Sequence, residues 1–167
     1  GLVGSEMCIR DSSSADENTT NDNYSQLKDG VEYYNHDRYA QITVTDASFN
    51  KNATQIKVAV DNKKAVNILD NKAEVQGAAI VKTDDEIWTD NKDGSYTAKL
   101  KFTGNHLYKI EASSTDLAGN KTEEGTVADS KSKEFYIDEL APVGKVQFST
   151  DKTDAGIIGN WWENILN

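Results

Sequence analysis

The sequence predicts an all-β fold, an antiparallel sandwich of short strands. Residues 95–102 alternate apolar and polar side chains, which is the period of a strand with one buried face. The side chains expected on that buried face are Tyr96, Ala98, Leu100 and Phe102. Turn compositions such as Gly104-Asn105 and residues 116–120 separate runs of this kind. Six to eight short strands with turn signals between them are typical of a sandwich.

The first strands begin at Gly30. Residues 30–34 form a short strand or its approach, and residues 38–45 alternate next. The side chains of this second strand that we expect to face inward are Ala40, Ile42 and Val44. A turn over residues 46–50 carries one apolar plug, Phe49, and residues 55–61 then alternate through Ile56, Val58 and Val60.

The middle of the chain is less regular. Residues 65–69 and 75–81 indicate short edge strands, although their alanines leave a helical turn open, so the structure of residues 63–82 stays unassigned. Residues 90–94 predict a hairpin turn with Asp-Gly at its tip, leading into residues 95–102. Residues 107–114 form the next strand, and residues 134–138 the last one before Pro142.

These elements divide the chain into three parts: a tail over residues 1–29, a folded domain over residues 30–141, and the start of a second, truncated module over residues 142–167. Ser, Asp, Asn and Thr dominate residues 11–29, which predicts disorder. Residues 1–12 closely resemble a string produced when sequencing-adaptor DNA is translated by mistake; the alternative is an ordinary disordered tail. On either interpretation we exclude them, and Cys8 with them, from the predicted fold.

Composition excludes several classes of function. The 167 residues carry a net charge of −10, which argues against binding nucleic acid or an anionic membrane surface. No apolar run approaches the roughly 20 residues of a membrane-spanning helix. The one cysteine lies in the tail, so residues 30–141 can form neither a disulfide framework nor a zinc cluster.

Four segments in order resemble the bacterial Ig-like repeats of Gram-positive cell-surface proteins. They are YYNHDRYAQITVTDASFN, DGSYTAKLKF, TDLAGN and FYIDELAP, at residues 33–50, 93–102, 115–120 and 135–142. Residues 143–166 are similar to the start of a neighbouring repeat. The resemblance implies an immunoglobulin-like sandwich in an exported, extracellular protein of the cell surface or cell wall, with neighbouring repeats of the same chain as partners. It implies a spacer, stalk or adhesive module and no catalytic residues.

Three aspartates are the only metal-ligand candidates. Asp46, Asp116 and Asp138 each stand at the end of a predicted strand. If two of those ends share one edge of the sandwich, their carboxylates could hold Ca²⁺ together with backbone carbonyls. In the alternative, each carboxylate accepts hydrogen bonds from its own turn amides.

No constellation of residues indicates an enzyme. His36 and His106 each sit beside a turn, far apart in sequence, and are best interpreted as solvated turn residues. Neither a Gly-x-Ser-x-Gly elbow nor a Gly-rich phosphate loop occurs.

Aromatic residues leave a second function open. Trp88 is expected to fill the core between the sheets, with a ligand platform as the alternative, and Tyr108 is a candidate corner tyrosine. Trp161 and Trp162 could stack on sugars or belong to a module cut short. The alternative to a spacer is a glycan- or calcium-binding accessory module of a larger surface enzyme or adhesin. Under either function, a host or cell-wall glycan or protein stays open as a partner. A long exposed aromatic face would favour binding, whereas short, blunted edges would favour the spacer.

Overall fold

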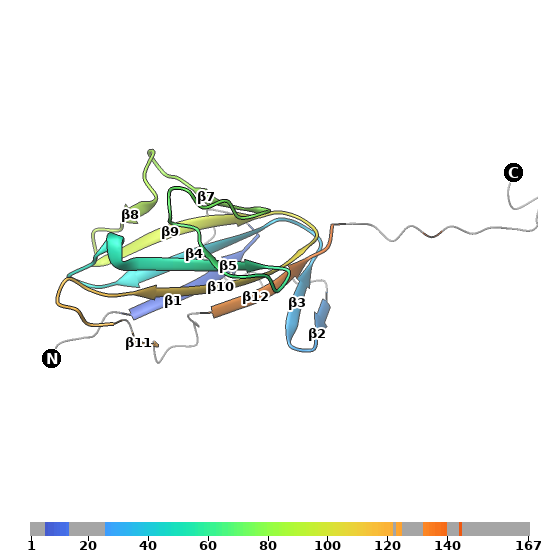
Figure 1. Ribbon diagram of the computed structural model, residues 1–167, viewed down its shortest axis with the longest axis horizontal. Helices are drawn as coiled ribbons and strands as arrows, with labels where there is room; N and C mark the ends of the chain where they lie inside the picture. The colour runs from blue at the N-terminus through green and yellow to red at the C-terminus, as the bar shows by residue number, and fades with distance from the viewer. Residues whose placement is uncertain (1–5, 14–25, 122, 125–131, 140–143, 145–167) are drawn as a thin grey trace, which may run out of the picture.

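The protein is an all-β sandwich. The computed structural model describes residues 6–13, 26–121, 123–124, 132–139 and 144. Two β-sheets pack face to face, and in the described residues the only helical element is one 3₁₀ turn, Lys51–Ala53 (Figure 1). The prediction of an all-β sandwich is confirmed.

The first sheet has the strand order β11-β1-β4-β9-β7, and β8 also pairs with β9. All its pairs are antiparallel except the short parallel pair of β1 with β11. Its strands are β1 (Glu6–Ser12), β4 (Arg38–Thr45), β7 (Ala78–Val81), β8 (Trp88–Asp90), β9 (Ser95–Phe102) and β11 (Glu123–Glu124).

The second sheet has the order β2-β3-β12-β10-β5-β6. Here β3 and β12 run parallel, and the other neighbours are antiparallel. Its strands are β2 (Gln26–Lys28), β3 (Val31–Tyr34), β5 (Thr54–Val60), β6 (Val66–Asn67), β10 (His106–Ser114) and β12 (Ser132–Ile137). The predicted antiparallel pairing therefore holds for most of the fold, with one parallel pair in each sheet.

The core lies between the two sheets. Alternate residues of β4, β5, β9 and β10 are buried, which confirms the inward faces predicted from the sequence with one exception: Tyr96 is only half-buried, and its neighbour Ser95 is buried. Phe102 of the first sheet meets Phe135 of the second edge to face, with ring centroids 5.2 Å apart. Burial of apolar surface on this scale is the main force that holds such layers together.

Strand β1 corrects the predicted domain boundary. It pairs with β4 over seven residues, from Glu6 opposite Thr45 to Ser12 opposite Tyr39. Met7 and Ile9 point into the core and are 1% and 0% exposed. The prediction of a disordered tail over residues 1–29 is therefore wrong for Glu6–Ser12 and also for Gln26–Lys28. The adaptor origin of the leading string stays a hypothesis.

The unassigned segment, residues 63–82, contains two short edge strands and no helical turn. β6 pairs with β5, and β7 pairs with β9. Between them Ile68 is buried in the core. The edge-strand interpretation is thus correct, but both strands are shorter than predicted.

Tyr108 forms the predicted corner. Its hydroxyl donates a 2.5 Å hydrogen bond to the carbonyl of Thr103, five residues upstream. The Thr103 N–H donates in turn to the carbonyl of Gly77. Gly77 has φ +74°, and a Cβ at this position would collide with the Tyr108 hydroxyl, so two independent constraints favour glycine here.

The proposed second module lies outside the described residues, apart from Gly144. The same is true of Trp161 and Trp162.

Candidate functional site

The candidate site is a groove of about 860 Å³ at one side of the sandwich. Its walls come from the turn between β4 and β5, from β6 with the loop that follows it, and from the segment that leads into β8. In Figure 1, β8 and the start of β5 both lie toward the left of the molecule, where these segments meet. The groove therefore spans the exposed edges of both sheets.

Three aromatic rings form one wall of the groove. Phe49 stacks on Tyr96 with centroids 4.4 Å apart, and it meets Trp88 edge to face at 5.0 Å. The pairing of β8 with β9 explains this cluster, because Trp88 stands opposite Ala98 and therefore on the same face as Tyr96. All three rings are half-buried. Trp88 thus packs against the margin of the core without being fully buried, and it also lines the groove; its use as a ligand platform stays a prediction.

Two asparagine side chains are held in fixed orientations beside these rings. Asn67 Oδ1 accepts hydrogen bonds from the backbone N–H groups of Ile56 and Leu69, at 3.1 and 3.3 Å. Asn50 Oδ1 accepts one from the N–H of Asn52 at 3.1 Å. Because backbone N–H groups bind the side-chain oxygen of each asparagine, the side-chain NH₂ group is the part of the amide that can still donate to a ligand. The rim adds more carboxylates than lysines: Asp70, Asp85, Glu86, Asp90, Lys51 and Lys82.

The three calcium candidates are not brought together. Asp46 and Asp116 lie at the same end of the sandwich, where the N–H of Leu117 donates to the carbonyl of Ser48. Asp138 follows β12 at the opposite end, next to the pair of Ile137 with His106. In the part of the chain that the structure describes, no three His, Cys, Asp or Glu side chains could hold a metal ion.

Turn amides already engage two of these carboxylates. Asp46 Oδ1 accepts a 2.8 Å hydrogen bond from the N–H of Ser48. Asp116 accepts one from the N–H of Asn120 at 2.8 Å and another from its side-chain amide at 3.1 Å. These bonds to Asn120 lower the pKa of Asp116. A cation at either position would have to compete with these turn hydrogen bonds.

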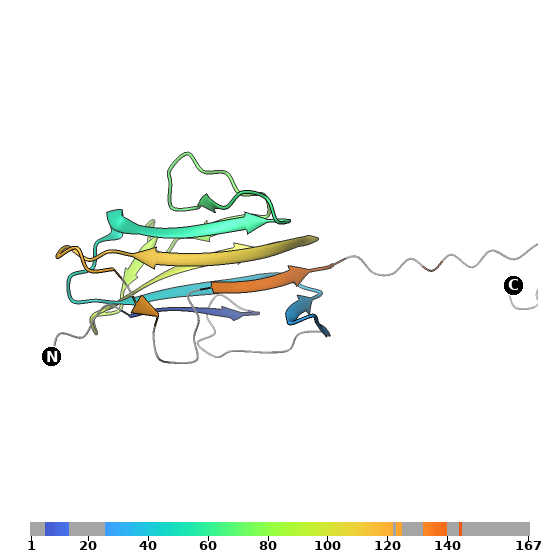
Figure 2. The ribbon, with the colours of Figure 1, turned by 60° about the horizontal axis from the view of Figure 1, so that its bottom comes forward.

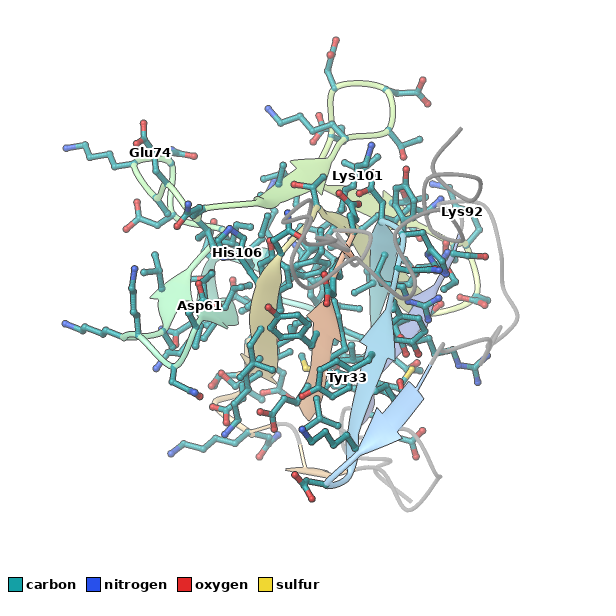
Figure 3. The ribbon with its side chains drawn as sticks, turned by 90° about the vertical axis from the view of Figure 1, so that its right-hand side faces the viewer. Tyr33, Asp61, Glu74, Lys92, Lys101 and His106 are labelled. Atoms are coloured by element: carbon teal, nitrogen blue, oxygen red, sulfur yellow. The ribbon has the colours of Figure 1, made fainter. Side chains whose placement is uncertain are left out.

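Both histidines lie beside turns, as the sequence indicated, but neither is simply solvated. His106 Nδ1 lies 2.7 Å from Asp61 Oδ2, and its side chain is only 20% exposed. Figure 3 shows the two side chains beside each other at neighbouring strand ends. Hydrogen bonds from the Leu107 N–H and then from His106 lower the pKa of Asp61. His36 contacts the carbonyl of Asp37 at 2.8 Å. These are contacts that fix turns.

The sequence analysis did not predict one feature of the structure, a buried ion pair. Arg38 Nη2 lies 2.6 Å from Asp11 Oδ2, and the side chains are 1% and 3% exposed. The guanidinium carbon sits 3.7 Å from the centre of the Tyr34 ring, and the Tyr34 hydroxyl donates to Glu32 at 2.6 Å. Burial and the Glu32 hydrogen bond raise the pKa of Tyr34. The signal for Arg38 was present, since it shares the inward register of Ala40 and Ile42.

Comparison with known proteins adds no relative. No protein-family model matches the chain, and no curated protein or solved structure gives a match. Among the described residues, no helix has the length and apolar character to cross a bilayer.

Proposed function

We propose that this sandwich is an Ig-like structural repeat, a spacer or stalk module of an exported bacterial surface protein. The observation that carries the proposal is the path of the chain. β1 begins with Glu6 opposite Thr45, where β4 ends, whereas β12 ends with Ile137 opposite His106, where β10 begins. These are opposite ends of the sandwich, as the courses of β1 and β12 show in Figures 1 and 2. Modules of this kind can be joined end to end into a stalk.

The strand order supports the Ig-like assignment. The Ig fold sets strands A, B, E and D against C, F and G. Here β1, β4, β9 and β7 stand in the first order, facing β5, β10 and β12 in the second. Strand β10 corresponds to strand F. Near its start, the hydroxyl of Tyr108 donates a hydrogen bond to the carbonyl of Thr103, as in a tyrosine corner. The neighbouring repeats implied by the sequence resemblance would then be its partners in the chain.

The edges and surface also favour a spacer over an adhesive face. The outer strands of both sheets, β2, β6, β7 and β11, have only two to four residues each. Short edge strands discourage pairing with other chains. Among the described residues, the exposed large hydrophobic side chains are Val66 at 37% and Leu117 at 72%. Isolated residues of this kind do not form a contiguous apolar patch that could bind another protein.

A pulling experiment tests the spacer role. A stalk module loaded through its two ends should unfold in one cooperative step. With residues 6–139 released, the fully extended chain would measure roughly 440–480 Å before the folded length is subtracted. Single-molecule force spectroscopy on the full chain, tethered at both termini, measures this step. Gradual extension without a discrete event would refute the proposal.

The direction of loading provides the control. Glu6 and Leu117 both lie toward one end of the sandwich, so force applied through tethers at these two residues should peel strands apart. We expect a lower unfolding force in this geometry than between the termini. Equal forces in the two geometries would show that the arrangement of the chain ends gives no mechanical advantage.

A further inference from the structure

The groove contains a polar group with no partner of its own. In the part of the chain that the structure describes, the indole N–H of Trp88 donates no hydrogen bond to a protein acceptor and is open to solvent. The indole of a half-buried tryptophan normally finds a partner for this group. The ring lines an open groove, beside two asparagine amides whose oxygens are engaged elsewhere. The indole and the two asparagine side chains therefore line the same groove.

From this arrangement we propose that the groove binds a neutral oligosaccharide. The face of an aromatic ring carries partial negative charge, and the C–H groups on one face of a pyranose carry partial positive charge. Phe49, Trp88 and Tyr96 supply such rings. Sugar hydroxyls both donate and accept hydrogen bonds, so they match the indole and amide donors as well as the carboxylate acceptors of the rim. The inference does not depend on the spacer role.

The lining of the groove disfavours an anionic ligand and a purely apolar one. Carboxylates outnumber lysines along the groove, and the whole chain has a net charge of −10. An anionic glycan would be repelled by this field. A purely apolar ligand would leave the asparagine and carboxylate groups desolvated without partners, which is costly. A groove of about 860 Å³ lies within the usual range for a small-ligand site, roughly 300–1,000 Å³.

The groove is held in place before any ligand arrives. Asn67 bridges β5 and the loop after β6 through its hydrogen bonds to Ile56 and Leu69. Phe49 is held between the rings of Trp88 and Tyr96. Because these side chains lose little freedom on binding, even a weak set of contacts can give measurable affinity.

Titration of the ¹⁵N-labelled full chain tests the proposal directly. The probes are three neutral hexasaccharides (cellohexaose, chitohexaose and maltohexaose), a heparin hexasaccharide and a trilysine peptide. We expect at least one neutral probe to shift the amides of residues 49–54, 67–71 and 82–90, with a Kd on the order of 1 mM. Absence of groove shifts with all three at about ten times that concentration would overturn the proposal. Tighter binding of heparin or trilysine at the groove would overturn it too.

Variants locate the contact. Trp88→Ala should weaken binding about tenfold, and Trp88→Phe, which keeps a ring but removes the N–H, by a smaller factor. Asn50→Ala is a second groove variant at a turn position, in case Trp88→Ala unfolds. Tyr33→Ala is the matched control, because Tyr33 packs against Tyr136 and does not line the groove. Equal affinity of wild type, Trp88→Phe and Asn50→Ala would refute the assignment.

Discussion

The buried pair of Asp11 and Arg38 gives the sharpest test of the fold. If β1 docks as the structure shows, Asp11→Ala leaves the Arg38 guanidinium buried at 1% exposure without its carboxylate. No other bond would compensate for the loss, because Nε and Nη1 of Arg38 already have no acceptor among the described residues. Lys133, 3.8 Å from Asp11 Oδ1, would add a second positive charge near the unpaired guanidinium. The variant should therefore be strongly destabilised.

The size of the effect follows from the burial. Removing one partner of a buried ion pair costs about 3–5 kcal/mol. A domain of this size has a total stability of roughly 5–15 kcal/mol, so the loss is a large share of it. Urea unfolding followed by circular dichroism measures the change. The double variant Asp11→Leu/Arg38→Met removes both charges and should recover to within about 1 kcal/mol of wild type or exceed it.

A small loss would refute the reasoning. If Asp11→Ala costs less than about 1 kcal/mol, β1 does not dock in solution, and the tail inferred from the sequence is correct. Glu6→Ala is the control on the same strand, because Glu6 is exposed. A surface change of this kind should stay within about 0.5 kcal/mol.

Three further outcomes are expected. Tyr108→Phe, which loses the bond to Thr103, should cost about 0.5–1.5 kcal/mol by urea titration, and no loss would show that the corner adds nothing. The pKa of Asp61 is lower in the folded protein than in the unfolded chain, where it is about 3.9, so ionised Asp61 stabilises the fold above that pH. This stabilisation is lost as the pH falls through the folded-state pKa. Asp61→Asn should therefore make the Tm depend less on pH in the acid range, and an unchanged dependence would contradict this. Millimolar Ca²⁺ should not raise the Tm, because turn amides engage Asp46 and Asp116; a rise abolished by Asp116→Asn would reverse this.

Sequence reasoning predicts the centre of this fold well for a physical reason. Strands β4, β5, β9 and β10 each have one face in the core, so their apolar period of two is visible in the sequence. The turns between them carry Gly, Asn and Asp, whose conformations those turns need. Asn105 has φ +66° and Gly94 has φ +88°, both in turns that the composition indicated.

The groove and β1 were harder to predict because neither is local. The groove forms where three segments meet. The register of β8 against β9 places Trp88 on the same face as Tyr96, with Phe49 in contact with both rings, and this register depends on the tertiary structure. In β1 the inward positions are Met7, Ile9 and Asp11, so a charge interrupts the apolar pattern. Its partner Arg38 lies 27 residues away. Nothing in a local window pairs the two charges.

That interruption leads to a last prediction, about register. A slip of one residue in β1 would turn Cys8 and Arg10 inward and Asp11 outward, because strand side chains alternate. Arg38 would then be buried without a carboxylate. The lost ion pair therefore makes the slipped register less stable than the loss of Met7 and Ile9 from the core alone would make it. We expect the double variant Asp11→Leu/Arg38→Met to remain folded but to lose this penalty. The amides of residues 6–12 should then give more than one set of NMR signals, where wild type gives one. A single set in the double variant would show that apolar packing alone fixes the register.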